Sequence, residues 1–307
     1  MLKGFVTIAT GDERYYRMAR TLLRSYRQTC KSPVRFAVIA DRENSYTAEF
    51  DDVVILDNPT NSWMDKLRLL DCCPYEENIF IDADCLVYQD INFFWGLFAD
   101  ADDFSCFGKA LPMDSRDGWF TAEAAAVYPI KFITHLHGIC YFIRRGETIK
   151  EMGTLCQDII NNYNAVRYKG FNDKLADEPV FALAMAVLDL KPIERNPEYY
   201  CFVPFATKLQ SNYFTKEVSF ENPKDGRMDC CCIVHWGNLN TEKAQYLADA
   251  RMVDAQEKGI TGSLGQRLLY EKQGLLCYYR MKDAVNAARE KLTWFSGRIW
   301  AKVTGKG

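Results

Sequence analysis

The sequence predicts an α/β fold in which helices flank a central, mostly parallel sheet. Its first half alternates short apolar runs with segments of helical periodicity. Several of these runs are uninterrupted, as expected for strands buried on both faces. Polar residues follow some of them at the carboxyl end, where ligands of open α/β sheets bind. We expect this domain to span residues 1–258, with a basic helical extension at 259–307.

The first two elements are predicted from an apolar run and a capping residue. Residues 3–9 form an apolar strand, and Asp12 follows as a helix N-cap. Apolar residues at near-helical spacing then indicate a helix that ends before Pro33. These residues are Met18, Leu22 and Tyr26.

The remaining elements continue the alternation. Strands are expected at residues 34–40, 53–56, 79–81, 104–107, 138–143 and 230–234, and helices at 64–73, 147–163 and 177–188. Pro74 closes the helix at 64–73, and Pro179 lies in the first turn of its helix, where a missing N–H costs nothing. From His235 onward the composition becomes helical.

Composition excludes several classes of protein. A net charge of −3 provides no general attraction for nucleic acid, and no run of about 18 apolar residues predicts a membrane span. The apolar run at residues 1–10 is too short for a secretion signal. We therefore expect a cytoplasmic protein that does not bind nucleic acid.

The twelve cysteines favour a reducing compartment over a disulfide framework. Most are expected to be small buried apolar residues. The clusters at 72–73 and 230–232 lack the two-residue gap of the usual zinc ligands, which disfavours a structural zinc site.

The C-terminal tail from residue 280 contains seven basic and two acidic residues, with apolar residues on roughly one face of a helix. This pattern has two interpretations. The tail is either a last helix packed on the core with a solvated basic side, or a helix on a membrane surface. The second would give peripheral contact with the inner surface of a membrane.

A pair of acidic residues, Asp82 and Asp84, follows the apolar strand at 79–81 and precedes the apolar sequence Cys-Leu-Val. Carboxylates in such surroundings are costly unless they are paired or bound to a metal. Oxygen ligands suit hard cations, and a cation between two phosphates stabilises the charge that develops when a diphosphate leaves. We therefore interpret Asp82 and Asp84 as metal ligands.

The segment from Phe80 to Val87 resembles the Asp-x-Asp strand of glycosyltransferases with the GT-A fold, especially glycosyltransferase family 8, the glycogenin and galactosyltransferase-like group. The resemblance extends over residues 1–245 in ordered pieces. It implies a transferase that uses Mn²⁺ or Mg²⁺ and moves a sugar from a UDP-sugar donor to a hydroxyl acceptor with retention of the anomeric configuration. The acceptor would be a glycan, a lipid-linked group or a protein.

The same resemblance implies roles for individual residues. The donor would be bound by Thr10, Asp12, Tyr15, Lys66 and Ala83, with Arg68 as the second choice for the phosphate contact. His235 corresponds to the third metal ligand, although the family's Gly and Lys-Pro-Trp that follow it are shifted or absent, and Lys243 is a candidate replacement for that lysine. Asp177 and Glu178 correspond to an Asp-Gln pair beside the reacting carbon, with glutamate in place of the usual glutamine. His137 stands where the family often has asparagine.

Purely structural interpretations stay open for several of these residues. Asp12 fits an ordinary N-cap, Tyr15 a packing residue, and Glu178 an acid favoured at a helix start. His135 and His137 share one face of a strand, which fits core or acceptor-site residues better than a metal pair.

Alternative functions also remain. The Asp-x-Asp pattern occurs in phosphohydrolases of the haloacid dehalogenase type, where it normally follows the first strand. A nucleotidyltransferase would share the broad fold, but no glycine-rich basic loop follows the first strand. A third possibility is a catalytically inactive transferase homologue that binds a glycan or a partner.

Overall fold

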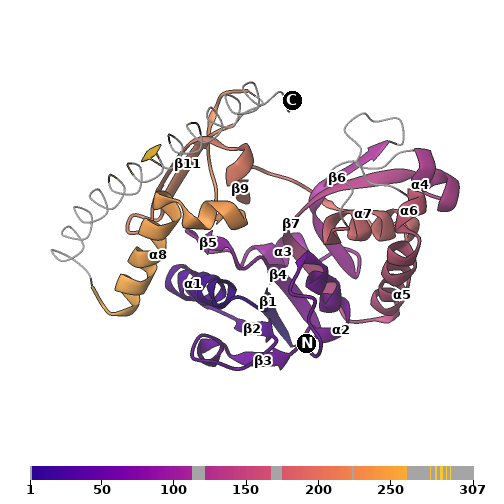
Figure 1. Ribbon diagram of the computed structural model, residues 1–307, viewed down its shortest axis with the longest axis horizontal. Helices are drawn as coiled ribbons and strands as arrows, with labels where there is room; N and C mark the ends of the chain where they lie inside the picture. The colour runs from indigo at the N-terminus through magenta and orange to yellow at the C-terminus, as the bar shows by residue number, and fades with distance from the viewer. Residues whose placement is uncertain are drawn as a thin grey trace, which may run out of the picture.

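A seven-stranded sheet with the strand order β3-β2-β1-β4-β7-β6-β8 forms the centre of the fold (Figure 1). The computed structural model describes residues 2–112, 122–166, 175–222 and 225–260, and residues 277, 281, 284, 285, 288 and 291. The strands of this sheet are β1 (Lys3–Ala9), β2 (Arg35–Ala40), β3 (Asp52–Ile55), β4 (Glu77–Ile81), β6 (Phe104–Pro112), β7 (Phe132–Arg144) and β8 (Ile193–Glu194).

The strands of the central sheet mostly share one direction. β1 pairs parallel with β2 and β4, and β2 pairs parallel with β3. β7 runs antiparallel between β4 and β6, while β8 is parallel to β6. The predicted α/β class with a mixed, mostly parallel sheet is therefore confirmed.

Two smaller sheets of three strands each accompany the central one. Their strands are β5 (Cys85–Val87), β9 (Tyr200–Phe202), β10 (Thr207–Asn212), β11 (Glu217–Glu221), β12 (Met228–Cys230) and β13 (Ile233–His235). β13 lies between β5 and β9, whereas β10, β11 and β12 form an antiparallel meander. The chain that leaves β4 therefore passes directly into a second sheet.

Helices cover both faces of the central sheet. The described helices are α1 (Glu13–Thr29), α2 (Leu69–Cys72), α3 (Phe94–Leu97), α4 (Ala122–Val127), α5 (Glu147–Asn161), α6 (Tyr163–Val166), α7 (Asp177–Val187) and α8 (Ala244–Glu257), of which α8 packs on α1. Residues of α1 and α3 pack in one apolar cluster, and residues of α2, α5 and α7 pack in another. Figure 1 shows α8 and β11 at one end of the molecule and α4, α5 and α6 at the other.

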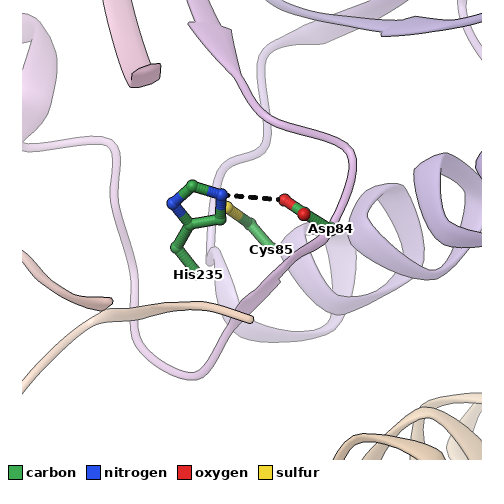
Figure 2. Close-up of side chains that lie close together, drawn as sticks. All are labelled: Asp84, Cys85 and His235. Atoms are coloured by element: carbon green, nitrogen blue, oxygen red, sulfur yellow. Dashed lines mark ion pairs between the residues drawn. The ribbon is translucent and has the colours of Figure 1, made fainter. Parts of the chain in front are cut away.

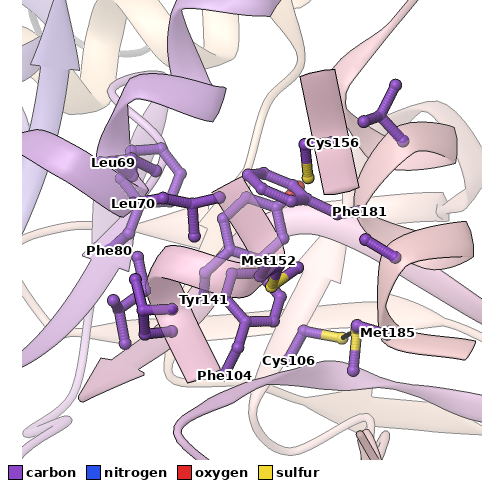
Figure 3. Packing of buried hydrophobic residues seen from close by; sticks show 14 of the residues in the cluster. Leu69, Leu70, Phe80, Phe104, Cys106, Tyr141, Met152, Cys156, Phe181 and Met185 are labelled. Carbon is purple, nitrogen blue, oxygen red and sulfur yellow. Dashed lines mark hydrogen bonds between the residues drawn. The ribbon is translucent and has the colours of Figure 1, made fainter. Parts of the chain in front are cut away.

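The core beneath α5 and α7 contains aromatic and sulfur-containing side chains among its aliphatic residues (Figure 3). The ring of Tyr141 lies between those of Phe80 and Phe104, at 5.6 Å from each, and 5.0 Å from that of Phe181. Such ring pairs stabilise a core beyond the burial of their area. This packing fixes α7, which contributes residues to the site described below, and β4 and β7, which border that site.

Two predicted elements are wrong in form. The segment predicted as a helix at 64–73 is a 3₁₀ helix, η2 (Trp63–Arg68), followed by the single turn α2. The strand predicted at 230–234 is divided between β12 and β13, which belong to different sheets, because the chain turns at the buried Cys231 and Cys232. The predicted strand at 138–143 is longer and spans the whole of β7.

All twelve cysteines are free thiols, and nine of them are buried, as the composition predicted. Within the described residues, none of the helices combines the length and the apolar character needed to cross a membrane. The predicted extension at 259–307 lies almost entirely outside the described residues, so its membrane contact stays a prediction.

Candidate functional site

A group of charged side chains lies where the central sheet meets the sheet of β5, β13 and β9. We call these residues the central cluster. They come from η2, the turn between β4 and β5, the first turn of α7, and the end of β13. The central cluster consists of Lys66, Asp82, Asp84, Asp177, Glu178 and His235.

The two aspartates lie in a tight turn between two buried strands. Asp82 directly follows β4, and its backbone N–H donates to the carbonyl of Ile139 in β7 at 3.0 Å. The turn closes through the N–H of Cys85, which donates to the Asp82 carbonyl at 3.1 Å. Apolar strands on both sides thus fix the backbone that carries the two carboxylates.

Lys66 is the basic residue of the central cluster. Its Nζ lies 2.6 Å from Asp82 Oδ2 and 3.8 Å from Asp177 Oδ2, and it also donates to the carbonyl of Gly138 at 3.5 Å. Burial lowers the pKa of the Lys66 ammonium, but the two carboxylates outweigh burial and raise it above the usual value. Lys66 therefore carries its charge inside the site.

His235 approaches both aspartates from β13. Its Nε2 lies 3.0 Å from Asp84 Oδ1 and 3.6 Å from Asp82 Oδ2. Figure 2 shows the imidazole facing Asp84, with the Cys85 thiol beside the ring. His235 is the register partner of Cys85 across β13 and β5, so the strand pairing itself places the histidine over the turn.

Asp177 and Glu178 begin α7 on the other side of Lys66. Asp177 accepts a hydrogen bond from the Tyr141 hydroxyl at 3.2 Å, and Glu178 Oε1 accepts one from the Gly138 N–H at 2.6 Å. A Cβ at Gly138 would lie 2.9 Å from Glu178 Oε1 and 3.0 Å from the Tyr141 hydroxyl. The glycine therefore allows β7 to approach the two acids closely.

The central cluster holds more acidic than basic groups. It contains four carboxyl groups and one ammonium, so it carries excess negative charge unless protons or a cation compensate it. Burial raises the pKa of Asp82 more than Lys66 lowers it, and Asp84 lies nearby as a second negative charge. Burial also disfavours the charged form of Asp84, but His235 outweighs it and lowers the pKa.

Burial and the neighbouring Asp177 carboxylate raise the pKa of Glu178 to about 7. An acid whose folded pKa exceeds its unfolded value of 4.5 stabilises the fold below pH 4.5, and this contribution disappears as the pH rises through 7. Between these values we expect wild type to lose stability relative to Glu178→Gln by up to about 1.4 kcal/mol per pH unit. Urea titrations of both proteins from pH 4.5 to 8 measure the difference in their free energies of unfolding. If this difference does not change with pH, the pKa of Glu178 is not raised.

The residues present fit a divalent cation. His235 Nδ1 is buried and makes no hydrogen bond within the described residues, and the contact given for the buried Asp84 Oδ1 is the ion pair with His235 Nε2 at 3.0 Å. Ligand atoms of Asp84, Cys85 and His235 all lie within 4.8 Å of one another. Burial raises the pKa of the Cys85 thiol well above its usual range, which keeps the sulfur protonated and a poor ligand. The set Asp82, Asp84 and His235 supplies the oxygen and nitrogen atoms that Mg²⁺ and Mn²⁺ accept.

Of the residues predicted to bind a donor, Thr10, Asp12 and Tyr15 follow β1, Ala83 follows β4, and Lys66 lies in η2. Asp12 caps α1 by accepting from the N–H of Arg14 at 2.8 Å, so its structural role is confirmed. The guanidinium of Arg14 stacks on the ring of Tyr15 at 4.9 Å and donates to its hydroxyl. The buried Ala83 donates its N–H to Asp82 Oδ1 at 3.0 Å. Of the donor-binding candidates, Lys66 belongs to the central cluster, and Ala83 is hydrogen-bonded to its member Asp82.

Asp65, the neighbour of Lys66 in η2, is not among the residues predicted from the sequence. This buried residue accepts hydrogen bonds from the Thr10 hydroxyl at 2.9 Å and from the N–H groups of Thr60 and Asn61. It therefore holds the loop after β3 against the end of β1 and orients its neighbour Lys66. The signal was present, because Ser62 and Asp65 form the Ser-x-x-Asp pattern of a capping box.

Other candidates lie outside the central cluster. Arg68 contacts the carbonyl of Asp57 at 3.5 Å, and Lys243 is exposed at the start of α8. His135 and His137 share a face of β7 as predicted, with ring centroids 5.6 Å apart. His137 immediately precedes Gly138 and so borders the central cluster.

No family model and no curated protein matches the sequence. Two similar solved structures are of the galactosyltransferase LgtC: an active-site variant with glutamine replaced by glutamate, and a complex with donor and acceptor sugar analogs. The identities are 10% and 9%, and each match has a TM-score of 0.45 over 76% of this chain and 87% of that chain.

A third similar structure is the apo form of the glycosyltransferase GlyE from Streptococcus pneumoniae. Its identity is 14% and its TM-score 0.39, over 62% of this chain and 45% of that chain. At these identities and scores, we base no functional conclusion on the similarity.

Proposed function

We propose that the chain is a metal-dependent glycosyltransferase that moves a sugar from a nucleotide diphosphate donor, specifically a UDP-sugar, to a hydroxyl group of an acceptor. One observation carries this proposal. Four carboxyl groups, one histidine and one lysine gather in a buried cluster at the carboxyl end of β4, where ligands of α/β sheets bind. The cluster holds more carboxyl groups than basic groups, and a divalent cation would compensate this excess negative charge.

Each part of the central cluster has a proposed role. Asp82, Asp84 and His235 would hold Mn²⁺ or Mg²⁺, because His235 Nε2 lies 3.0 Å from Asp84 Oδ1 and 3.6 Å from Asp82 Oδ2 in a buried site. When bound, the cation would stabilise the negative charge on the diphosphate as the bond to the sugar breaks. Lys66 would add a fixed positive charge, since Asp82 and Asp177 keep its ammonium protonated.

Asp177 and Glu178 would face the sugar. Tyr141 and the Gly138 N–H hold these acids at the start of α7, so their oxygens are positioned before any ligand arrives. Carboxyl groups at this place can orient sugar hydroxyls and stabilise positive charge on the reacting carbon. Retention of the anomeric configuration remains a prediction from the sequence resemblance.

The direct test is a thermal-shift panel with the full chain. We expect Mn²⁺ with UDP to raise the melting temperature, because a ligand at 100 times its dissociation constant stabilises a protein by about 2.7 kcal/mol. UDP without a cation should stabilise much less, since the acidic cluster repels the diphosphate. The donor sugar is then identified from a set of UDP-sugars by release of UDP.

The same panel tests the alternatives. Stabilisation by Zn²⁺ alone would favour a site of Asp84, Cys85 and His235 over the proposed one. Hydrolysis of para-nitrophenyl phosphate without any effect of UDP would favour a phosphohydrolase. Binding of UDP and Mn²⁺ without turnover of any UDP-sugar would indicate an inactive homologue. No response to UDP and Mn²⁺ would refute the proposed function.

A further inference from the structure

Aromatic side chains border the central cluster. Phe202 is the last residue of β9, and its register partner in the parallel strand β13 is His235. Register partners in a sheet project from the same face, and the two ring centroids are 4.8 Å apart. Phe202 therefore touches a proposed metal ligand.

A second ring extends this surface toward solvent. Phe205 ends the 3₁₀ turn η3 (Val203–Phe205), in which Pro204 restricts the backbone. Its ring centroid lies 5.1 Å from that of Phe202, and the residue is 58% exposed. A single exposed phenylalanine is ordinary in a folded protein, but this one continues a row of rings that begins at the central cluster.

His137 completes the surface from the side of β7. Its ring centroid lies 5.7 Å from that of Phe202 and 6.1 Å from that of Phe205. The next residue, Gly138, contacts both Lys66 and Glu178. The three rings therefore adjoin the proposed metal ligands on one side and the carboxylates of α7 on the other.

The chemistry of His137 suits a polar ligand with an apolar face. Burial and the nearby charge of Arg195 lower the pKa of His137 to about 3, so its imidazole is neutral at physiological pH. A neutral imidazole has one donor and one acceptor nitrogen. Phe202 and Phe205 offer flat apolar surface beside it, and such a mixture of rings and few polar groups is typical of small-molecule sites.

We infer that Phe202, Phe205 and His137 form an aromatic platform that binds the pyranose ring of the acceptor, so that the acceptor is a carbohydrate. The C–H face of a pyranose is apolar and packs against aromatic rings, while its hydroxyls bond with the imidazole. Since the platform adjoins the central cluster, a ring bound there presents a hydroxyl to the reacting sugar. This inference rests on the proposed function and narrows its acceptor from glycan, lipid-linked group or protein to a glycan.

Saturation-transfer difference NMR tests the platform with methyl β-D-glucopyranoside and methyl β-D-galactopyranoside, added to the full chain with UDP and the diamagnetic cation Mg²⁺. We expect wild type to bind at least one of them and Phe205→Ala to weaken that binding about tenfold, near the upper range for one aromatic contact. Phe205→Trp should keep the affinity because it keeps a ring. Phe93→Ala is the matched control, since Phe93 is 43% exposed and lies outside the platform.

The outcomes separate this inference from the proposed function. Hydrolysis of a UDP-sugar by Phe205→Ala should keep the wild-type KM, because the platform binds the acceptor and not the donor. If UDP and Mn²⁺ bind but neither glycoside does, or if Phe205→Ala binds like wild type, the platform is refuted and the transferase stands. A raised KM for the donor would also refute the inference. If UDP and Mn²⁺ do not bind, the proposed function fails, and with it the acceptor role of the platform.

Discussion

Replacing Asp82 by asparagine is expected to lower the turnover of the donor sugar by roughly 100- to 1,000-fold, the range found when one contact to a developing charge is removed. Asparagine has nearly the same shape, but it lacks the negative charge that attracts a cation. The fold should persist, because Lys66 still lies near Asp177 and the variant buries one carboxyl group fewer. Release of UDP without an acceptor measures turnover, and calorimetry measures Mn²⁺ affinity.

Two controls accompany this variant. Asp189→Asn removes an aspartate that is paired with Lys191 at the surface, and it should leave both turnover and Mn²⁺ affinity unchanged. Asp84→Asn should resemble Asp82→Asn, since His235 contacts both carboxylates. Wild-type turnover together with wild-type Mn²⁺ affinity in Asp82→Asn would remove Asp82 from the proposed metal ligands.

Replacing Lys66 by methionine is expected to impair both stability and turnover. Methionine fills a similar volume, but the four carboxyl groups of the central cluster then have no ammonium among them. Removing one partner of a buried ion pair typically costs about 3–5 kcal/mol. Urea denaturation without metal measures this loss. The loss should be smaller at pH 5 than at pH 8, because Asp82 and Glu178, whose pKa values are raised, take up protons.

The matched control is Lys191→Met, which breaks the exposed ion pair with Asp189. Surface pairs contribute about 0–1 kcal/mol, so this change should be small at every pH. An equal loss in the two variants would show that Lys66 is not the charge that balances the central cluster. For turnover, Lys66→Arg keeps the charge and should retain more activity than Lys66→Met.

Local sequence patterns predicted the parts of the site that depend on neighbouring residues. An uninterrupted apolar run predicted the strand that ends before Asp82, because a strand buried on both faces has no polar alternation. The N-cap at Asp12 followed from the preference of a short acidic side chain for exposed N–H groups. Pro179 likewise predicted the start of α7, because proline is tolerated in the first turn of a helix, and this start carries Asp177 and Glu178.

The 3₁₀ form of η2 could not be predicted from such local patterns. Its apolar residues suggested a helix at 64–73, but the segment is a 3₁₀ helix whose start is held by the hydrogen bonds of Asp65 to Thr60 and Asn61. These contacts tie the loop after β3 to the end of β1 through Thr10. These hydrogen bonds to loop residues determine the local backbone more strongly than the helical spacing of the apolar residues does. They also set the position of Lys66.

The sequence by itself determined the class of the fold, the strand that presents Asp82 and Asp84, and the helix start that presents Asp177 and Glu178. Only the tertiary structure decided that Lys66 lies between Asp82 and Asp177, that His235 lies over Asp84, and that Phe202 lies against His235. The physical reason is the range of the interactions. Periodicity and capping act between residues a few positions apart, whereas these contacts depend on which strands pair and in which register, and that choice is made by packing across the whole chain.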